Sequence, residues 1–226
     1  SDGCSSDLSE ETTLKMAPEP TLRRLPGYCH LLRRLSEQEV TTVSCTLIGR
    51  ELNLDPTQVR KDLALTGVVG RPKVGYKTRD LIANLEEFLG WRNAQDVFLA
   101  GVGHMGAALL GYAPFTDYGI RIVAAFDSDP AKVGKEAHGV PVFPIEKLAN
   151  LATRMKIRLG ILTVPVPVAQ EVCDLMVSSG IRAIWNFAPV ALDVPEHVIV
   201  QKEELFASLG ALSSKLAAAM RAEGVA

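Results

Sequence analysis

The stretch Asp96-Val-Phe-Leu-Ala-Gly-Val-Gly-His-Met-Gly106 decides the fold of the larger part of this chain. An apolar run typical of a buried strand leads into the pattern G-x-G-x-x-G, and a helix-like run follows at residues 107–112. Gly101 allows a sharp turn out of the strand, Gly103 lets a pyrophosphate approach the backbone, and Gly106 lets the helix pack closely on the sheet. The stretch therefore predicts the first strand, turn and helix of a dinucleotide-binding domain.

A second strand, Arg121-Ile-Val-Ala-Ala-Phe-Asp127, ends on an acidic residue. Asp127 stands 21 positions after Gly106, near the spacing at which a carboxylate accepts hydrogen bonds from the adenosine ribose hydroxyls. A carboxylate there repels a 2′-phosphate, so the sequence favours NAD(H) over NADP(H). The alternative is a Rossmann-like domain that binds another nucleotide, such as coenzyme A, or none.

Short apolar runs alternate with helical patterns after Asp127, which predicts a doubly wound parallel sheet of the α/β class. The expected strands are residues 140–143, 159–164, 183–187 and 198–200, with helices at 145–154 and 168–179. Ligands of such sheets bind at the carboxyl ends of the strands, so Thr163-Val-Pro165 and Asn186-Phe-Ala-Pro189 are expected near a nicotinamide. For Pro165 and Pro189 the simpler interpretation is that they only end their strands.

The N-terminal part differs from the rest in charge. The whole chain of 226 residues has a formal net charge of −2, yet Thr21 to Arg79 contains eleven Lys or Arg and only five Asp or Glu. Such asymmetry indicates a basic module that meets phosphates. Residues 1–20 are polar and acidic without an apolar core segment, so we expect a disordered leader there and no secretory signal.

Three helices are expected within the basic module. The first begins at Leu22, and the second is opened by Ser44 or by Cys45-Thr46. Asp55 as N-cap and Pro56 at the first helical position start the third, which runs to about Leu65. Two short helices joined by so brief a turn form a helix-turn-helix.

The third helix has an apolar side at Val59 and Leu63, and the opposite side carries groups that could enter a major groove. The glycine-rich segment 67–76 resembles the wing of a winged helix with a basic tip, and a helix at 78–90 closes the domain. The DNA-binding residues expected are Ser44, Thr46, Thr57, Gln58, Arg60, Lys61, Arg71 and Lys73. The alternative is an ordinary solvated helix face.

The remaining segments complete the expected domain organisation of winged helix at 21–90, Rossmann domain at 91–202 and C-terminal helix at 203–226. Residues 91–95 are the expected linker. The last helix is apolar around much of its circumference, so it needs a partner surface, and a second subunit is the expected one. Two-fold dimers of helix-turn-helix proteins read palindromic sites.

Composition sets the remaining bounds. With 47% hydrophobic and 22% charged residues, and no apolar run near the ~18 residues that span a bilayer, the chain is expected to be cytoplasmic without membrane partners. The four cysteines have neither paired nor metal-ligand spacing, so no metal site is expected. Cys29 and Cys173 are expected in apolar cores, and a thiol redox switch is the alternative.

Six motifs in order resemble the Rex family of redox-sensing transcriptional repressors. They are residues 57–63 (TQVRKDL), 70–76 (GRPKVGY), 101–106 (GVGHMG), 122–130 (IVAAFDSDP), 162–165 (LTVP) and 186–189 (NFAP). The resemblance implies a homodimer with an N-terminal winged helix, a Rossmann domain and a C-terminal helix exchanged between subunits. It also implies that NADH releases the protein from a palindromic operator DNA.

The resemblance adds three residues to the expected cofactor site. Tyr112 matches a family tyrosine near the nicotinamide, and Glu204-Leu205 matches the start of the exchanged helix that approaches the partner's cofactor. The complete set expected to bind NAD(H) is Gly101, Val102, Gly103, His104, Met105, Gly106, Tyr112, Asp127, Ser128, Thr163, Val164, Pro165, Asn186, Phe187, Ala188, Pro189, Glu204 and Leu205.

Two other function classes stay open. A nicotinamide-dependent dehydrogenase usually needs an acid or base beside the nicotinamide, and the four histidines are scattered without such a pattern, so no catalytic residue is expected. A regulator that binds coenzyme A or another nucleotide shares the expected fold.

Overall fold

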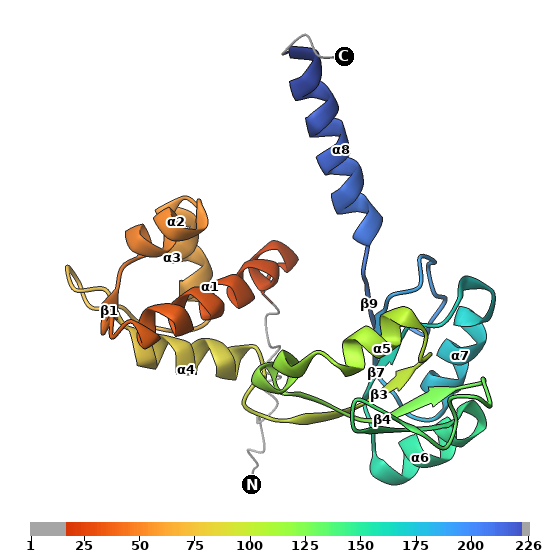
Figure 1. The fold of residues 1–226 in the computed structure, drawn as a ribbon. Coiled ribbons are helices and arrows are strands. Elements are labelled where there is room, and N and C mark those ends of the chain that lie inside the picture. The colour runs from red at the N-terminus through yellow and green to blue at the C-terminus, as the bar shows by residue number, and fades with distance from the viewer. Residues whose placement is uncertain (1–16, 223–226) are drawn as a thin grey trace, which may run out of the picture. The chain divides into compact units, whose positions relative to one another are not determined.

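Helices dominate the N-terminal part of the chain. The computed structural model describes residues 17–222, and the chain divides between Arg92 and Asn93 into two units (Figure 1). The first unit contains α1 (Glu19–Glu37), β1 (Thr42–Val43), α2 (Cys45–Leu52), α3 (Pro56–Leu65), β2 (Tyr76–Lys77) and α4 (Thr78–Phe88). Glu19 and Pro20 thus belong to a helix, although they were assigned to the leader, and residues 1–16 lie outside the described residues.

One apolar core holds these helices together. Residues at helical spacing on α1, such as Leu25 and Leu32, are fully buried against Ile48 of α2, Leu63 of α3 and Leu85 of α4. Burial of each such side chain contributes about 1.5–3 kcal/mol. Trp91 also packs against this core, so it belongs to the first unit and not to a free linker.

Side-chain caps fix where the two short helices begin. The Ser44 hydroxyl accepts a hydrogen bond from the Leu47 amide at 3.1 Å, and the Asp55 carboxylate accepts from the amides of Thr57 at 2.6 Å and Gln58 at 3.3 Å. Each cap satisfies backbone donors that a helix end leaves free. These contacts confirm the predicted starts of α2 and α3.

The wing is a tight turn beside a very short sheet. The Arg71 amide donates to the Gly75 carbonyl at 2.8 Å, and the Gly75 amide donates back to Arg71 at 2.9 Å. Beyond the turn, β2 pairs antiparallel with β1. The tip, including Lys73, is therefore held by its own hydrogen bonds and by the strand pair.

The second unit is a seven-stranded sheet in the order β5-β6-β4-β3-β7-β8-β9. Its strands are β3 (Gln95–Ala100), β4 (Ile120–Asp127), β5 (Glu136–Ala137), β6 (Val140–Pro144), β7 (Leu159–Leu162), β8 (Ala183–Asn186) and β9 (Ile199–Lys202). All neighbours pair in parallel except β5 and β6. The parallel strands have the order of a dinucleotide-binding Rossmann sheet, with the switch point at β3 and β7.

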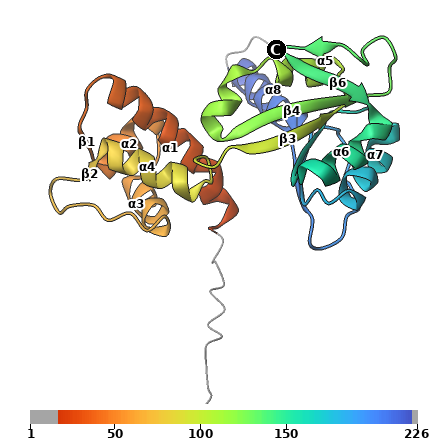
Figure 2. The same ribbon diagram turned by 90° about the horizontal axis from the view of Figure 1, so that it is seen from below.

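Helices cover both faces of this sheet (Figure 2). They are α5 (His104–Leu110), η1 (Ala113–Tyr118), η2 (Ile145–Lys147), α6 (Leu148–Met155) and α7 (Val166–Ser178). Phe98 and Ala100 of β3 pack with α6 and α7, whereas Val97 and Leu99 pack with α5. This alternation follows from the two-residue period of a strand.

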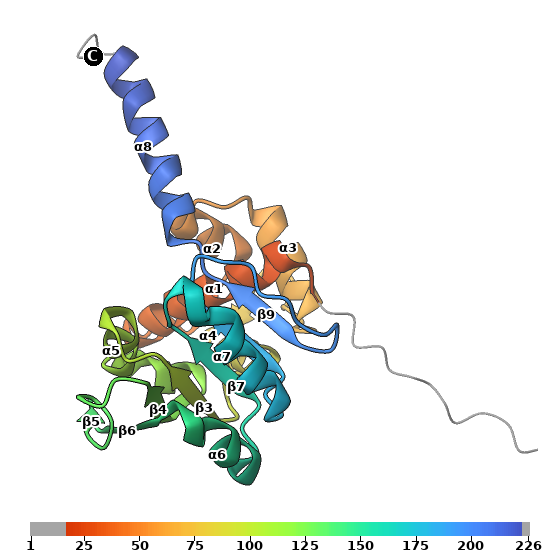
Figure 3. The ribbon, with the colours of Figure 1, turned by 90° about the vertical axis from the view of Figure 1, so that its right-hand side faces the viewer.

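Most predicted boundaries differ from the structure by a few residues, and three of these differences affect the predicted sites or the linker. The helix after the glycine loop begins at His104 and ends at Leu110, so Tyr112 lies beyond it, at the start of η1. Gln95 belongs to β3 instead of a linker. The last helix, α8 (Leu205–Ala222), follows β9 and begins two residues later than expected, so Glu203 precedes it (Figure 3).

Candidate functional site

The glycine loop between β3 and α5 has the geometry that its sequence predicts. Gly101 has φ +97°, and a Cβ there would lie 2.8 Å from the carbonyl oxygen of Thr163. A Cβ on Gly106 would collide with the carbonyl oxygen of Gly101, whereas one on Gly103 would meet nothing within 4 Å. Two glycines thus allow the turn and the close packing, and the third leaves open space for a ligand.

A cavity of about 1100 Å³ lies at the carboxyl ends of β3, β4 and β7. Its volume suits a nucleotide. Seven residues of the predicted cofactor site line it, together with apolar side chains of α7 such as Val168, Val172 and Leu175. The seven are Gly101, Gly103, Asp127, Ser128, Thr163, Val164 and Pro165.

The Asp127 carboxylate is fixed at the edge of this cavity. It accepts hydrogen bonds from the amides of Val102 at 2.7 Å and Asp129 at 2.8 Å, and from Lys132 Nζ at 3.1 Å. Burial alone would raise the pKa of Asp127, but these three contacts outweigh it and hold the pKa below its usual value. The group is therefore an ionised acceptor at neutral pH, as a ribose diol requires.

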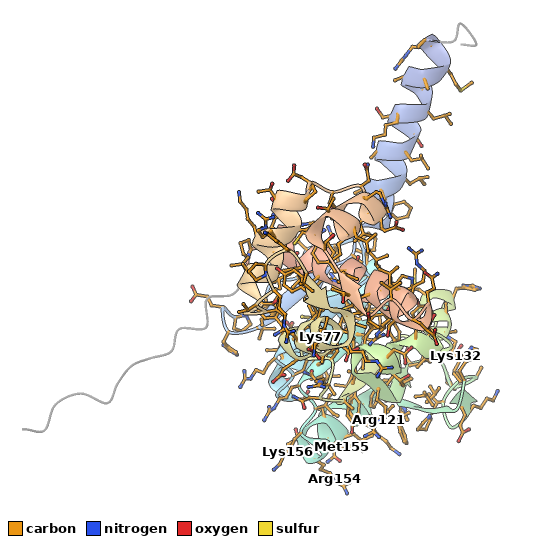
Figure 4. The ribbon with its side chains drawn as sticks, turned by 90° about the vertical axis from the view of Figure 1, so that its left-hand side faces the viewer. Lys77, Arg121, Lys132, Arg154, Met155 and Lys156 are labelled. Carbon is orange, nitrogen blue, oxygen red and sulfur yellow. The ribbon has the colours of Figure 1, made fainter. Side chains whose placement is uncertain are left out.

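Further charges around the cavity were missed by the sequence analysis. Asp129, Glu146, Glu171 and Asp174 line it beside Asp127, and Lys132 is the one Lys or Arg among its lining residues (labelled in Figure 4). Lys132 contacts the carboxylates of Asp127 and, at 3.7 Å, Asp129. Glu146, Glu171 and Asp174 lie outside every quoted motif, because only the fold brings them to the rim of this cavity.

The predicted nicotinamide residues are divided: Thr163, Val164 and Pro165 line that cavity, whereas Tyr112 and residues 186–189 do not. Tyr112, Phe115, Trp185 and Phe187 form a chain of rings with successive centroid distances of 5.0, 5.9 and 4.7 Å. Trp185 and Phe187 pack on the α5 face of the sheet, and Trp185 Nε1 donates to Glu203 Oε1 at 2.7 Å. Tyr112 is 51% exposed, so it is free to contact a ligand on this face.

Other predicted cofactor residues have local structural contacts. The buried Asn186 side chain donates to the Val190 carbonyl at 2.9 Å and accepts from the Ala188 amide at 2.8 Å, which shapes the turn before Pro189. His104 and Met105 open α5 and do not line the cavity. Among the described contacts, Glu204 accepts from Lys202 at 3.0 Å, and the Leu205 side chain lies outside the described residues.

Five of the eight predicted DNA-binding residues surround one hollow of the first unit. It measures about 480 Å³ and is lined by Ser44, Thr46, Arg60, Arg71 and Lys73, among others. Arg60 of α3 and Arg71 and Lys73 of the wing thus bring three basic side chains together beside the start of α2. None of these three forms an ion pair with a residue in the described part of the chain.

The remaining three predicted DNA-binding residues lie on α3. Thr57 and Lys61 are exposed, as expected, but Gln58 is half-buried. Its Nε2 donates to Asp62 Oδ1 at 2.9 Å. The Gln58 side chain, which was expected to contact bases, thus already donates one hydrogen bond to a carboxylate of its own helix.

Asp62 is a buried anion that the sequence analysis did not single out. The same carboxylate also accepts hydrogen bonds from Arg24 at 2.7 and 2.8 Å, Tyr28 at 2.7 Å and Thr21 at 3.0 Å. Burial would raise its pKa, but these donors hold the pKa of Asp62 well below its usual value. The cluster ties α1 to α3.

The described side chains of α8 are all exposed in the single chain. Phe206 is 74% exposed and Leu212 is 62% exposed, and Leu209 and Leu216 are similar. A helix with so much exposed apolar surface needs a covering partner. Elsewhere in residues 17–222, Cys29, Cys45 and Cys173 are free and buried, and no group of His, Cys, Asp or Glu could hold a metal ion.

Comparison with known proteins gives the family. Residues 17–64 match the family "Putative DNA-binding protein N-terminus", and residues 92–190 match "CoA binding domain". Redox-sensing transcriptional repressors Rex from Treponema denticola and Bacteroides fragilis are 46% and 42% identical to this chain. Each match covers 88% of this chain, and it covers 96% and 90% of the two relatives. The chain belongs to the Rex family of redox-sensing transcriptional repressors.

Solved Rex structures agree with this assignment. The Rex-family repressor RSP in complex with β-NAD⁺ and operator DNA is 31% identical, with a TM-score of 0.86 over 93% of this chain and 97% of that chain. RSP in complex with β-NADH has a TM-score of 0.83 at 30% identity, over 93% and 99%. Within the described part of this Rex chain, no helix is long and apolar enough to span a membrane.

Proposed function

We propose that this Rex chain is a DNA-binding repressor that senses the NADH/NAD⁺ ratio, and that NADH binding releases it from a palindromic operator. One observation carries the proposal: the same chain contains both the glycine-loop cavity, which Asp127 lines, and the basic hollow of the helix-turn-helix. The complexes of RSP with NADH, and with NAD⁺ and operator DNA, support both halves.

The cavity fits the adenosine half of NAD(H). Asp127 would accept the ribose hydroxyls, the open wall at Gly103 would admit the pyrophosphate, and the apolar side chains of α7 would pack on adenine. The exposed Tyr112 ring lies on the other face, where a nicotinamide would complete the site. The cofactor supplies the redox signal, and the chain distinguishes its two forms by contact alone.

No enzymatic role is proposed for these residues. His104 lies at the start of α5, and the residues lining the cavity include no histidine, cysteine or tyrosine. The relatives are likewise named as repressors.

The matching family's name makes coenzyme A the second candidate ligand. Coenzyme A carries a 3′-phosphate on the adenosine ribose, and the rim carboxylates of Asp127, Asp129 and Glu146 would repel it. Titration of the protein with NADH and with coenzyme A, followed by tryptophan fluorescence, separates the two candidates. We expect saturation by NADH in the micromolar range or below and no saturation by coenzyme A.

Replacing Asp127 by alanine should weaken NADH binding by roughly 1–3 kcal/mol, about 5- to 150-fold, because a charged acceptor is lost. The measurement is isothermal titration calorimetry. Lys135→Ala is the control, since Lys135 is exposed on the same loop and does not line the cavity. Unchanged affinity in Asp127→Ala would remove the ribose assignment.

Lys61→Ala and Lys73→Ala should each lower affinity for all DNA sequences and reduce the salt slope by about one unit, if each lysine neutralises one phosphate. Fluorescence anisotropy with duplexes selected by the protein from a random pool measures both quantities. Arg154→Ala, an equal charge change at the exposed end of α6, is the control (Figure 4). A wild-type salt slope in both lysine variants would contradict this docking.

A further inference from the structure

The Gln58 side chain is held by a fixed neighbour on the candidate recognition helix. Its Nε2 lies 2.9 Å from Asp62 Oδ1, one helical turn further along α3. Asp62 is fully buried and is held from α1 by Arg24 and Tyr28. The carboxylate therefore cannot turn away to release Gln58 without losing its contacts with a second helix.

The chemistry of this contact fixes which way the Gln58 amide points. An ionised carboxylate accepts hydrogen bonds and donates none, so only the NH₂ group of Gln58 can face it. The contacts that keep the pKa of Asp62 low also keep it ionised at neutral pH. The orientation of the amide is thus set by charge.

The other end of the amide is left for a ligand. The structure gives Gln58 Oε1 no donor, and within residues 17–222 the one buried side-chain oxygen or nitrogen without a partner is Oδ1 of Asn84. Oε1 is therefore open to solvent. Thr57 and Lys61, which lie one residue before and three residues after Gln58 on α3, are exposed.

We propose that Gln58 Oε1 accepts a hydrogen bond from an exocyclic amino group in the major groove. Asp62 is the positioning residue, because it binds the NH₂ group of Gln58 and so leaves Oε1 for the base. The amino groups available there are adenine N6 and cytosine N4, whereas guanine O6 and thymine O4 are acceptors. The strand that Gln58 faces must then carry adenine or cytosine at the contacted position. The inference rests on the proposed DNA binding and adds to it a base preference at one position of the DNA site.

The test is selection from a random pool of duplexes, followed by sequencing, with the full-length protein and its variants. Wild-type protein should select adenine or cytosine over guanine and thymine at one position of each half-site, by roughly fivefold or more. Gln58→Met should lose the preference at that position only. Asp62→Asn should lose it too, because an asparagine amide can either donate or accept and so lets Gln58 turn.

Tyr28→Phe is the matched control, since it removes a different hydrogen bond to the same carboxylate and leaves Gln58 in place. If Asp62 had a purely structural role, Tyr28→Phe and Asp62→Asn would both lower the affinity for DNA and leave the base preference unchanged. That result overturns the proposal. Selection of guanine or thymine at the position lost in Gln58→Met also overturns it. If wild-type protein selects no sequence at all, the proposed DNA binding itself fails.

Circular dichroism and NADH affinity report whether Asp62→Asn is folded. If it is not folded, nuclear magnetic resonance of the wild-type protein tests whether Asp62 orients the Gln58 amide. One Nε2 proton of Gln58 should be protected from exchange and remain so on addition of the selected duplex. Two freely exchanging Nε2 protons in the complex would overturn the positioning role of Asp62.

Discussion

Replacing Gly106 by alanine should lower NADH affinity by about a hundredfold or more while both units stay folded. The new Cβ would collide with the Gly101 carbonyl and lie 2.9 Å from Thr163 Oγ1, so the loop has to move. Thr163 Oγ1 itself donates to the Gly101 carbonyl at 2.6 Å, which leaves little freedom. Loss of two charge-assisted contacts to a pyrophosphate, each about 1.5–3 kcal/mol, gives this magnitude.

Isothermal titration calorimetry with NADH measures the effect, and thermal unfolding shows whether the variant is folded. Gly27→Ala is the matched control, because a Cβ at that helical position meets nothing within 4 Å. NADH affinity within about twofold of wild type in Gly106→Ala would mean that the ligand does not use this loop.

We propose that α8 joins two copies of this chain, so a chain that ends at Glu204 should be monomeric and should no longer respond to NADH. The removed helix α8 exposes Phe206, Leu209, Leu212 and Leu216 in the single chain, and burial of each contributes about 1.5–3 kcal/mol. Ending at Glu204 keeps the Trp185–Glu203 contact and the Lys202–Glu204 ion pair. The aromatic group beside Tyr112 therefore stays intact.

Light scattering gives the oligomeric state, and anisotropy with a selected duplex gives the NADH response. We expect monomers whose weak DNA binding is unchanged by NADH, because we propose that α8 is exchanged between two subunits, as the resemblance implies, and that it couples the two sites. Lys215→Ala, an exposed polar change on the same helix, should behave as wild type. A truncated dimer that releases DNA at the wild-type NADH concentration would exclude α8 as the coupling element.

The glycine loop and Asp127 could be predicted because their signal is local. Each glycine has a separate steric requirement, and the spacing to Asp127 follows from one strand, one turn and one helix. The cap at Asp55 likewise acts on the next three residues. Each of these interactions joins residues that are close together in the sequence, so a short motif contains both partners.

The Asp62 cluster could not be predicted in the same way. Its partners Thr21, Arg24 and Tyr28 lie 41, 38 and 34 positions away, and a charged residue on a short helix is normally exposed. The acidic rim residues Glu146 and Glu171 were missed for the same reason, since only the fold brings them together.

The central claim is that the two sites are linked, so that NADH and DNA oppose each other's binding. NADH must bind the DNA-free arrangement more tightly, and linkage then requires DNA to weaken NADH binding by the same factor. The direct measurement is calorimetric titration of NADH with and without a saturating selected duplex, beside titration of that duplex with and without NADH. We predict equal factors of at least roughly fivefold. NADH affinity that is the same with and without the duplex would contradict the account.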